Sequence, residues 1–433
     1  MIFCLLIAAL LPAAINILKA RQLTHAVFFS AGYLYYWVLP ILVGQIQIFS
    51  PGSENGFFGN WAGFFQNVPQ GQLEIYAVSI LVYYFCFMLG DMLARKTTPS
   101  IRKMKNPPLN FIFVLYIFVF IVAASYTYHL RSLIGANYND IGEGIFSMGT
   151  LVALSLVLLA LALFKTTQSE KATFLATISN RWMLGFFLIS FLQLTMGGRL
   201  YFVSSLLLLA SYRSVFFKKY SGGQLFAFAL GAAVFGGAVG LLRLRSGVNV
   251  GAVVLNLAGE PVGTSFSLVS FLGSNQIPWV EFPRFLAGDL LNLVPSAVVG
   301  NKIDFANKID FLPDPIKAGF YFVSPMGAMH SWVSFIINFG LAGTAVVMVF
   351  IGFFLRWLLM NAKSPIFKTQ YLMCSAFLTF TFFRDPFSMS LVKNIFEFSI
   401  VMPLVCAHVS GWLVWSAGAH SELIGQTGSA SHP

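Results

Sequence analysis

Apolar runs long enough to cross a membrane recur along most of this 433-residue chain, and they constrain its fold more than any other feature. A membrane-crossing helix needs about 20 apolar residues, because the hydrocarbon core is about 30 Å thick and a helix rises about 1.5 Å per residue. Only 9% of the residues are charged and 58% are hydrophobic, which leaves too few polar side chains for a water-exposed surface. The chain is therefore expected to be an all-α polytopic membrane protein.

We count eleven such segments, which predicts about eleven transmembrane helices. They cover roughly residues 2–18, 25–49, 73–94, 109–129, 145–164, 182–197, 200–217, 225–242, 330–355, 369–383 and 391–415. The expected domain order is helices 1 to 8 in residues 1–242, a large loop in 243–329, helices 9 to 11 in 330–415 and a tail in 416–433. The loop contains a stretch of helix-like apolar spacing near residues 282–293, so we expect an ordered cap with short amphipathic helices.

Basic and acidic residues fall on opposite sides of these spans. With the N-terminus outside, most of the 26 lysines and arginines lie in short cytoplasmic loops, which is the positive-inside pattern. Most of the 15 acidic residues then lie outside, together with the large loop. The tail is accordingly expected to be cytoplasmic.

Several classes of function lack their sequence signals. The net charge of +11 is scattered between apolar runs and forms no single basic patch, so no nucleic-acid partner is expected. The four cysteines all lie in apolar runs without metal-ligand spacing, which predicts no metal site and no disulfide framework. Asp-x-Asp, phosphate-loop, His-Glu-x-x-His and Gly-x-Ser-x-Gly motifs are all absent, so neither a cofactor nor a nucleotide is expected.

Two predicted spans are short for a bilayer, and each places an arginine near the outer face. The apolar run from Tyr371 to Phe383 covers only about 20 Å as a helix, so Arg384 is expected below the outer surface. Gly197 and Gly198 permit a tight turn that puts Arg199 at its edge. Ionisable groups at such depth are costly unless they face a protein interior or an aqueous cavity, which makes both arginines functional candidates.

Arg243 and Arg245 end the eighth span on the same face of the membrane. Four outward arginines would form a site for an anionic ligand, because guanidinium groups hold phosphates in a bidentate manner. The alternative is structural: these arginines extend to the lipid headgroups or pair with local acids, Arg384 with Glu397 for example.

A general base would have to lie on the same face. His330, where the large loop re-enters the membrane, is the first candidate, since a histidine can take a proton from a hydroxyl near neutral pH. The alternative for His330 is a helix-capping or headgroup histidine. Glu260, Glu143 and Asp385 are the alternative bases, each beside a possible turn.

Three stretches together resemble one family. Gly-Gly-Arg stands at 197–199, LLRLRSG at 241–247 and HSWVSFIINFGLAG at 330–343, and the last looks like the segment that closes the large loop. With the many-span topology and the late outer loop, the chain resembles the bacterial O-antigen polymerases (Wzy), which are close in type to O-antigen ligases. As topology the resemblance covers most of the chain, and as motif about 40 residues.

The resemblance implies a metal-independent, GT-C-like glycosyltransferase in the inner membrane of a Gram-negative bacterium, with its site facing the periplasm. It would move a growing glycan from undecaprenyl diphosphate onto the terminal sugar hydroxyl of a new undecaprenyl-diphosphate-linked repeat unit. Its partners would be these lipid-linked oligosaccharides, membrane lipid, and a chain-length regulator and flippase of the same pathway. In such an enzyme we expect Arg199, Arg243, Arg245 and Arg384 on the diphosphate, His330 as base, and Tyr321 and Glu260 on sugar.

Three other functions remain open. A ligase would use the same donor and transfer to lipid A core, and motifs this loose do not separate it from a polymerase. A flippase would need charge at mid-membrane, which most spans lack. A non-catalytic scaffold would have little use for arginines at three separate span ends.

Overall fold

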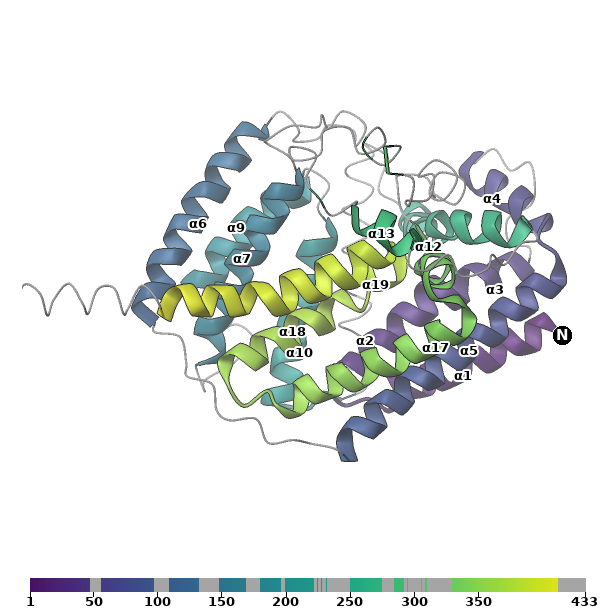
Figure 1. Cartoon of the computed structure of the whole chain (residues 1–433), viewed down its shortest axis with the longest axis horizontal. Helices are drawn as coiled ribbons and strands as arrows, with labels where there is room; N and C mark the ends of the chain where they lie inside the picture. Colours follow the sequence, from purple (N-terminus) through teal and green to yellow (C-terminus); the bar gives the residue numbers. More distant parts are fainter. Residues whose placement is uncertain are drawn as a thin grey trace, which may run out of the picture. The chain divides into compact units, whose positions relative to one another are not determined.

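The structure is a computed structural model and describes residues 1–46, 56–96, 109–131, 148–168, 180–195, 199–221, 250–274, 284–291 and 329–411, with a few isolated residues between them. Nearly all of these residues lie in helices and none lies in a strand (Figure 1). The all-α fold class is thereby confirmed for the described part of the chain.

The chain divides into two compact units. The first comprises Met1–Thr98, Leu206–Trp357 and Cys374–Phe396, and the second Pro99–Ser205, Leu358–Met373 and Glu397–Pro433. The first unit holds α1 (Ile2–Lys19), α2 (His25–Gly32), the π-helix η1 (Tyr33–Val38), α3 (Leu39–Gln45), α4 (Gly56–Gln66), α5 (Gln70–Lys96), α12 (Val250–Gly273), α13 (Arg284–Leu291) and α19 (Thr381–Arg384). The second holds α6 (Leu109–His129), α7 (Met148–Thr167) and α9 (Arg181–Thr195). The division falls inside α10 (Arg199–Phe216), α17 (Ser331–Met360), α18 (Pro365–Phe377) and the second π-helix η6 (Ser388–Val401).

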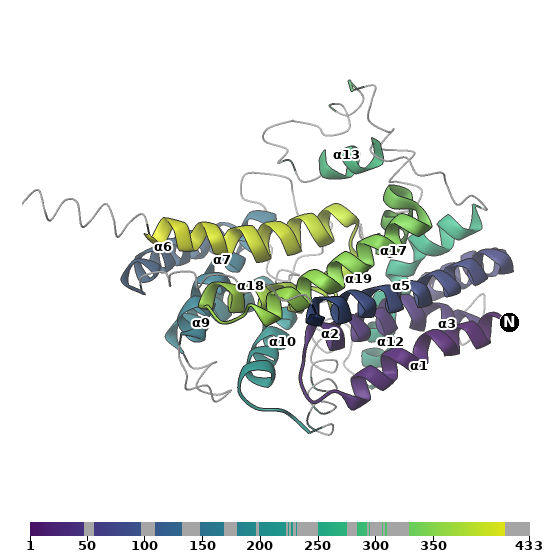
Figure 2. The same ribbon diagram turned by 60° about the horizontal axis from the view of Figure 1, so that its bottom comes forward.

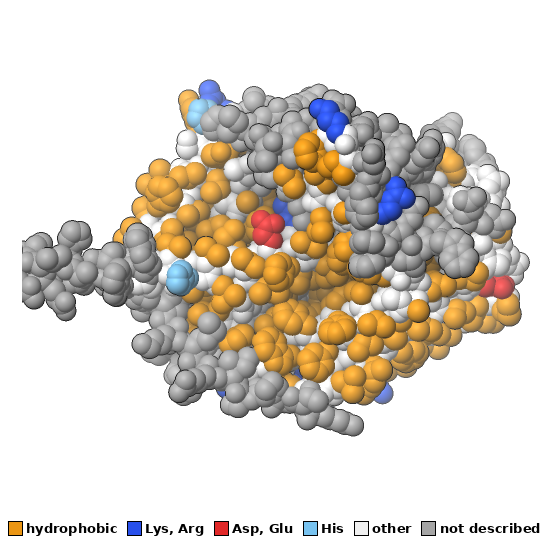
Figure 3. Space-filling model, in the orientation of Figure 1, with side chains coloured by type: hydrophobic (Ala, Val, Ile, Leu, Met, Phe, Trp, Pro, Cys, Tyr) orange, Lys and Arg blue, Asp and Glu red, His pale blue; other side chains and the backbone are white. Residues whose placement is uncertain are grey.

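Seven helices of the described residues are long and apolar enough to cross a membrane: Ile2–Lys19, His25–Gln45, Gln70–Ala94, Phe111–His129, Gly149–Thr167, Ser331–Met360 and Ser388–Gly411. Apolar side chains cover much of the face shown in Figure 3, with few described charges among them. On α6, for example, Val114, Phe118 and Ile121 are each more than half exposed, which suits contact with lipid. The multi-pass character is confirmed, while the number of eleven spans stays a prediction.

The shortest of the expected spans are short or broken helices in the structure. The expected sixth and seventh correspond to the shorter apolar helices Arg181–Leu194 and Tyr201–Phe216. The run from Tyr371 to Phe383 is not one helix, because α18 ends at Phe377 and α19 begins at Thr381 after a turn. The expected eighth span, 225–242, lies outside the described residues apart from two isolated positions.

Three long helices, α1, α5 and α17, lie side by side in the first unit (Figures 1 and 2). Two glycines bring α5 and α17 together: a Cβ on Gly90 would come within 2.0 Å of the Val349 carbonyl oxygen, and a Cβ on Gly352 within 2.0 Å of the Phe87 carbonyl oxygen. Small residues allow such close backbone approach, which replaces the hydrophobic driving force that is missing inside a bilayer.

Aromatic side chains fill the centre of the first unit. Phe29 of α2 stacks on Phe87 of α5 with ring centroids 3.7 Å apart, and Phe382 and Phe383 of α19 pack against Phe29. The π-helix η1 carries Tyr33, Tyr36 and Trp37, all with no exposed surface. Single π turns inside α-helices are rare and frequently lie at functional sites, which directs attention to η1.

The stretch from 243 to 329, expected as a loop with short helices, contains the 24-residue helix α12. From Val262 onward α12 is almost entirely buried, and it contacts α3, α4, α5 and η1. Pro261 and several small or polar residues interrupt its apolar pattern, which is why hydropathy alone does not predict this helix.

Candidate functional site

The site begins with a close approach between η1 and α19. Gly32 precedes η1, and a Cβ at this position would lie 2.4 Å from the Phe383 ring and 2.6 Å from the Thr379 carbonyl oxygen. Only glycine leaves room for α19 here, and α19 ends with Arg384. Because Gly32 has no side chain, α19 can approach η1 closely, and Arg384 at the end of α19 lies beside the π-helix.

Arg384 lies between two carboxylates. Its Nη1 is 3.5 Å from Oε1 of Glu260 on α12, and its Nε is 3.9 Å from Oδ1 of Asp385. Tyr36 of η1 donates a hydrogen bond of 3.0 Å from its hydroxyl to the same Glu260 oxygen. Arg384 is 28% exposed, Glu260 20% and Asp385 23%, so this polar cluster is recessed and still reaches the surface.

The first turn of α17 fixes the backbone on both sides of Arg384. Ser331 donates a hydrogen bond of 3.1 Å to the Phe383 carbonyl oxygen and accepts one of 3.3 Å from the Trp37 indole. Ser334 accepts a hydrogen bond of 2.9 Å from the Phe387 amide. Both serines are fully buried, so these bonds hold the 383–387 segment in place without competition from water.

His330 lies directly before this turn and has no exposed surface. Its Nε2 is 3.3 Å from the Tyr36 carbonyl oxygen, its ring stacks against Trp37 at 6.2 Å, and Tyr76 packs edge-on at 6.1 Å. The bond to a carbonyl oxygen requires the proton on Nε2, which leaves Nδ1 as the acceptor. Nδ1 is buried and has no hydrogen-bond partner among the residues that the structure describes.

Burial acts in opposite directions on His330 and Asp385, which lie just before the spans Ser331–Met360 and Ser388–Gly411 of the structure. Burial raises the pKa of the Asp385 carboxyl from 3.8 to about 6, with Arg384 opposing this shift and Glu260 adding to it. Burial lowers the pKa of His330 from 6.5 to about 3, opposed by the hydrogen bond to Tyr36. At neutral pH the cluster therefore contains a neutral imidazole and an aspartate that is more basic than usual.

Of the nine candidate residues, the structure brings three together in this cluster, Glu260, Arg384 and Asp385, with His330 adjacent through Tyr36. Arg199 begins α10, and its side chain is outside the described part. The others that lie outside the described residues are Arg243, Arg245, Tyr321 and Glu143. The ion pairs found for Arg384 involve Glu260 and Asp385, in place of the Glu397 considered from sequence.

Tyr36 is the member that sequence analysis missed. Its hydroxyl meets Glu260 and its carbonyl oxygen meets His330, so one residue joins two parts of the site. The signal for it was the dense aromatic run YLYYWV in the second span. Within the described residues no group of three His, Cys, Asp or Glu side chains is placed to hold a metal ion.

No known protein family, no curated protein and no solved structure matches this chain. Any functional conclusion therefore depends on the site itself. Its chemistry is that of a partly exposed guanidinium, already paired with carboxylates, next to a carboxyl group of raised pKa in an apolar protein.

Proposed function

We propose that this chain is an O-antigen polymerase, a glycosyltransferase that works on polyprenyl-diphosphate-linked glycans at the periplasmic face of a Gram-negative inner membrane. The cluster of Arg384, Glu260 and Asp385 is the observation that carries the proposal. All three positions belong to segments that the charge distribution predicts on the outer side. The fold brings together Glu260 of α12, Arg384 at the end of α19 and the following Asp385.

In the proposed reaction the bond between the sugar C1 and the diphosphate oxygen breaks. A new bond forms between C1 and the hydroxyl oxygen of the acceptor sugar, and undecaprenyl diphosphate leaves with the bonding electron pair. Arg384 would turn from Glu260 to the diphosphate and stabilise its developing charge. Arg199, Arg243 and Arg245 remain the further candidates for the same diphosphate.

The proton of the acceptor hydroxyl goes to a general base. The candidate bases differ in how accessible their side chains are. Asp385 and Glu260 keep part of their surface accessible, and the raised pKa of Asp385 suits it to accept a proton near neutral pH. His330, the first choice from sequence, would need a movement that uncovers Nδ1. In the resting arrangement its role is to position Tyr36, which in turn holds Glu260.

The test is a gene deletion complemented at matched expression with wild type, Arg384→Ala, Asp385→Asn or His330→Ala, with lipopolysaccharide ladders read on a gel. A polymerase deletion leaves core capped with a single repeat unit, and Arg384→Ala should repeat that pattern. Arg131→Ala, which removes an exposed arginine at the end of α6, is the matched control and should give a normal ladder.

Two other outcomes would replace the proposal. Bare core together with long undecaprenyl-linked glycan identifies a ligase. Repeat units retained on the cytoplasmic side of the membrane identify a flippase.

A further inference from the structure

We propose that a cavity bounded by α3, α4, α5 and the start of α1 is a binding site for a neutral saccharide. Under the proposed function, on which this identification of the ligand rests, the saccharide is a non-reacting sugar unit of the lipid-linked glycan. The cavity has a volume of about 310 Å³. That lies at the lower end of the range of about 300 to 1,000 Å³ for small-molecule sites, so it suits a short saccharide segment.

The cavity lining determines which ligands fit. Among the described residues that line it, none carries a charge, while three are glutamines: Gln45, Gln66 and Gln70. A diphosphate would find no cation among these described lining residues to stabilise its charge. Sugar hydroxyls both donate and accept hydrogen bonds, and each glutamine amide offers two N–H donors and a carbonyl acceptor.

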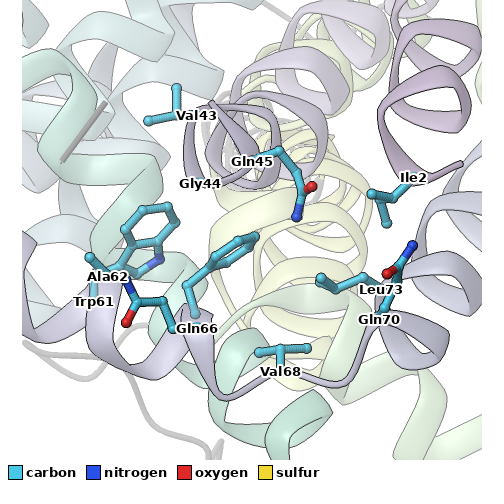
Figure 4. Close-up of a pocket in the computed structure, with 11 residues that line it drawn as sticks. Ile2, Val43, Gly44, Gln45, Trp61, Ala62, Gln66, Val68, Gln70 and Leu73 are labelled. Carbon is cyan, nitrogen blue, oxygen red and sulfur yellow. The ribbon is translucent and has the colours of Figure 1, made fainter. Parts of the chain in front are cut away.

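The amides are spread around the cavity. In Figure 4 the amide of Gln45 points from the end of α3 toward the side that carries Gln70 and Leu73, while Gln66 lies on the other side, near Ala62 and Trp61. Gln70 donates a hydrogen bond of 3.1 Å from Nε2 to Glu74 Oε1, which orients its side chain. The amide also has a second N–H and a carbonyl oxygen, and both groups can hydrogen-bond a ligand.

Aromatic rings form another part of the wall. Trp61 and Phe65 stack with centroids 5.3 Å apart, and the Trp61 indole donates a hydrogen bond of 2.7 Å to Ser265 of α12. A Cβ on Gly44 would come within 2.9 Å of both rings, so this glycine lets α3 close against them. The rings are therefore fixed in orientation, which reduces the entropy lost when a ligand binds.

The cavity and the polar cluster share two structural elements. Glu260 and Ser265 are five residues apart on α12, which is about 7.5 Å along a helix. The π-helix η1, which carries Tyr36, continues directly into α3, and α3 ends with Gln45. A glycan whose reducing end lies at Arg384 can thus extend along these shared elements to place another sugar among the glutamines.

The experiment measures saccharide binding without turnover. The full chain is placed in nanodiscs of phosphatidylethanolamine and phosphatidylglycerol, which carry no sugar headgroup. The probe is the uncharged fraction of the oligosaccharides released by acid from the surface polysaccharide of the source cell, titrated calorimetrically. Gln45→Leu combined with Gln70→Leu removes two amides at nearly constant volume. Asn67→Leu removes an exposed amide that does not line the cavity and is the matched control.

We expect the double variant to bind the oligosaccharide at least tenfold more weakly and Asn67→Leu to bind within twofold of wild type. Val43→Phe, which fills the cavity and leaves the amides intact, should weaken binding to a similar extent. Inorganic pyrophosphate should not displace the saccharide. Thermal unfolding of each variant identifies any that is misfolded, and the comparison then uses the folded ones.

Absence of binding to folded wild type, or double-variant binding within twofold of wild type, overturns the saccharide site. The proposed function fails separately, through normal lipopolysaccharide ladders in the deletion strain. A saccharide that binds in the cavity while the ladders are normal leaves the site standing and removes the polymerase assignment.

Discussion

Arg384 interacts with two carboxylates in the structure, so its functional and structural roles must be separated by experiment. Arg384→Ala would remove the cation that lies 3.5 Å from Glu260, a change that can destabilise the fold and mimic loss of function. Combining Arg384→Ala with Glu260→Gln removes both charges. We expect the double variant to unfold at nearly the wild-type temperature and still to produce no long glycan, because it lacks the Arg384 guanidinium that stabilises the leaving diphosphate. Recovery of normal ladders by the double variant would show that Arg384 is structural.

Asp385 and His330 give stability a pH dependence of opposite sign. The folded Asp385 carboxyl keeps its proton up to about pH 6 and the unfolded one only to 3.8, so the free energy of unfolding falls as pH rises through that window. For His330 the folded pKa is about 3 and the unfolded value 6.5, so the free energy of unfolding rises with pH over this wider window. The two effects partly cancel in the wild type.

Asp385→Asn removes only the contribution of Asp385, which lowers the free energy of unfolding as pH rises. We expect the variant to gain stability relative to wild type at pH 7.5, on the order of 3 kcal/mol at most, and to gain almost nothing near pH 4. Melting temperatures of both proteins in detergent at the two pH values measure this difference. An equal difference at both pH values would contradict the raised pKa of Asp385. If Asp385 is also the base, glycan transfer by wild type should increase with pH through about 6.

At this scale the sequence nominated candidate residues, while the partners of those residues came only from the structure. The short apolar run to Phe383 singled out Arg384, and the search for a base on the outer face singled out His330, Glu260, Asp385 and Glu143. Pairing depends on tertiary contacts: Glu260 and Arg384 are 124 positions apart. Tyr36 could not be distinguished from other aromatic residues in a buried helix, because its role depends on the π-helix and on one hydrogen bond.

Helix contacts in the first unit depend on glycines at the α5–α17 interface. A methyl group on Gly90 would meet backbone atoms of Val349 and Phe353, which cannot move aside as a flexible side chain can. Gly90→Ala should therefore lower stability by about 1 to 3 kcal/mol, the usual cost of overpacking. Gly63→Ala is the matched control, because nothing lies within 4 Å of its added Cβ in α4. Equal melting temperatures for the two variants would argue against this interface.

The break in α17 belongs to the same scale. Gly340 has φ of 67° and ψ of −178°, a conformation that essentially only glycine adopts, so the helix is interrupted after Phe339. Hydropathy predicted an unbroken span from 330 to 355, since the apolar run continues across the break. Sequence analysis thus places apolar helices well and their internal interruptions poorly, because a kink depends on a single backbone torsion.

The orientation of the whole molecule in the membrane remains a prediction from charge, and it decides whether the polar cluster faces the periplasm. Arg131 follows α6 and Lys218 follows α10, and both are exposed. With the N-terminus outside, position 131 is periplasmic and position 218 cytoplasmic. Single cysteines introduced at these positions, in a background with all four native cysteines replaced, allow a direct measurement.

A membrane-impermeant maleimide applied to cells with a permeabilised outer membrane should label Arg131→Cys and leave Lys218→Cys unlabelled until the inner membrane is opened. The reverse pattern would place Glu260, Arg384 and Asp385 in the cytoplasm. Glycan transfer onto exported repeat units would then be impossible at this cluster, while the all-helical fold and the contacts within it would be unaffected. Orientation is therefore the property of the whole molecule on which the proposed function depends most directly.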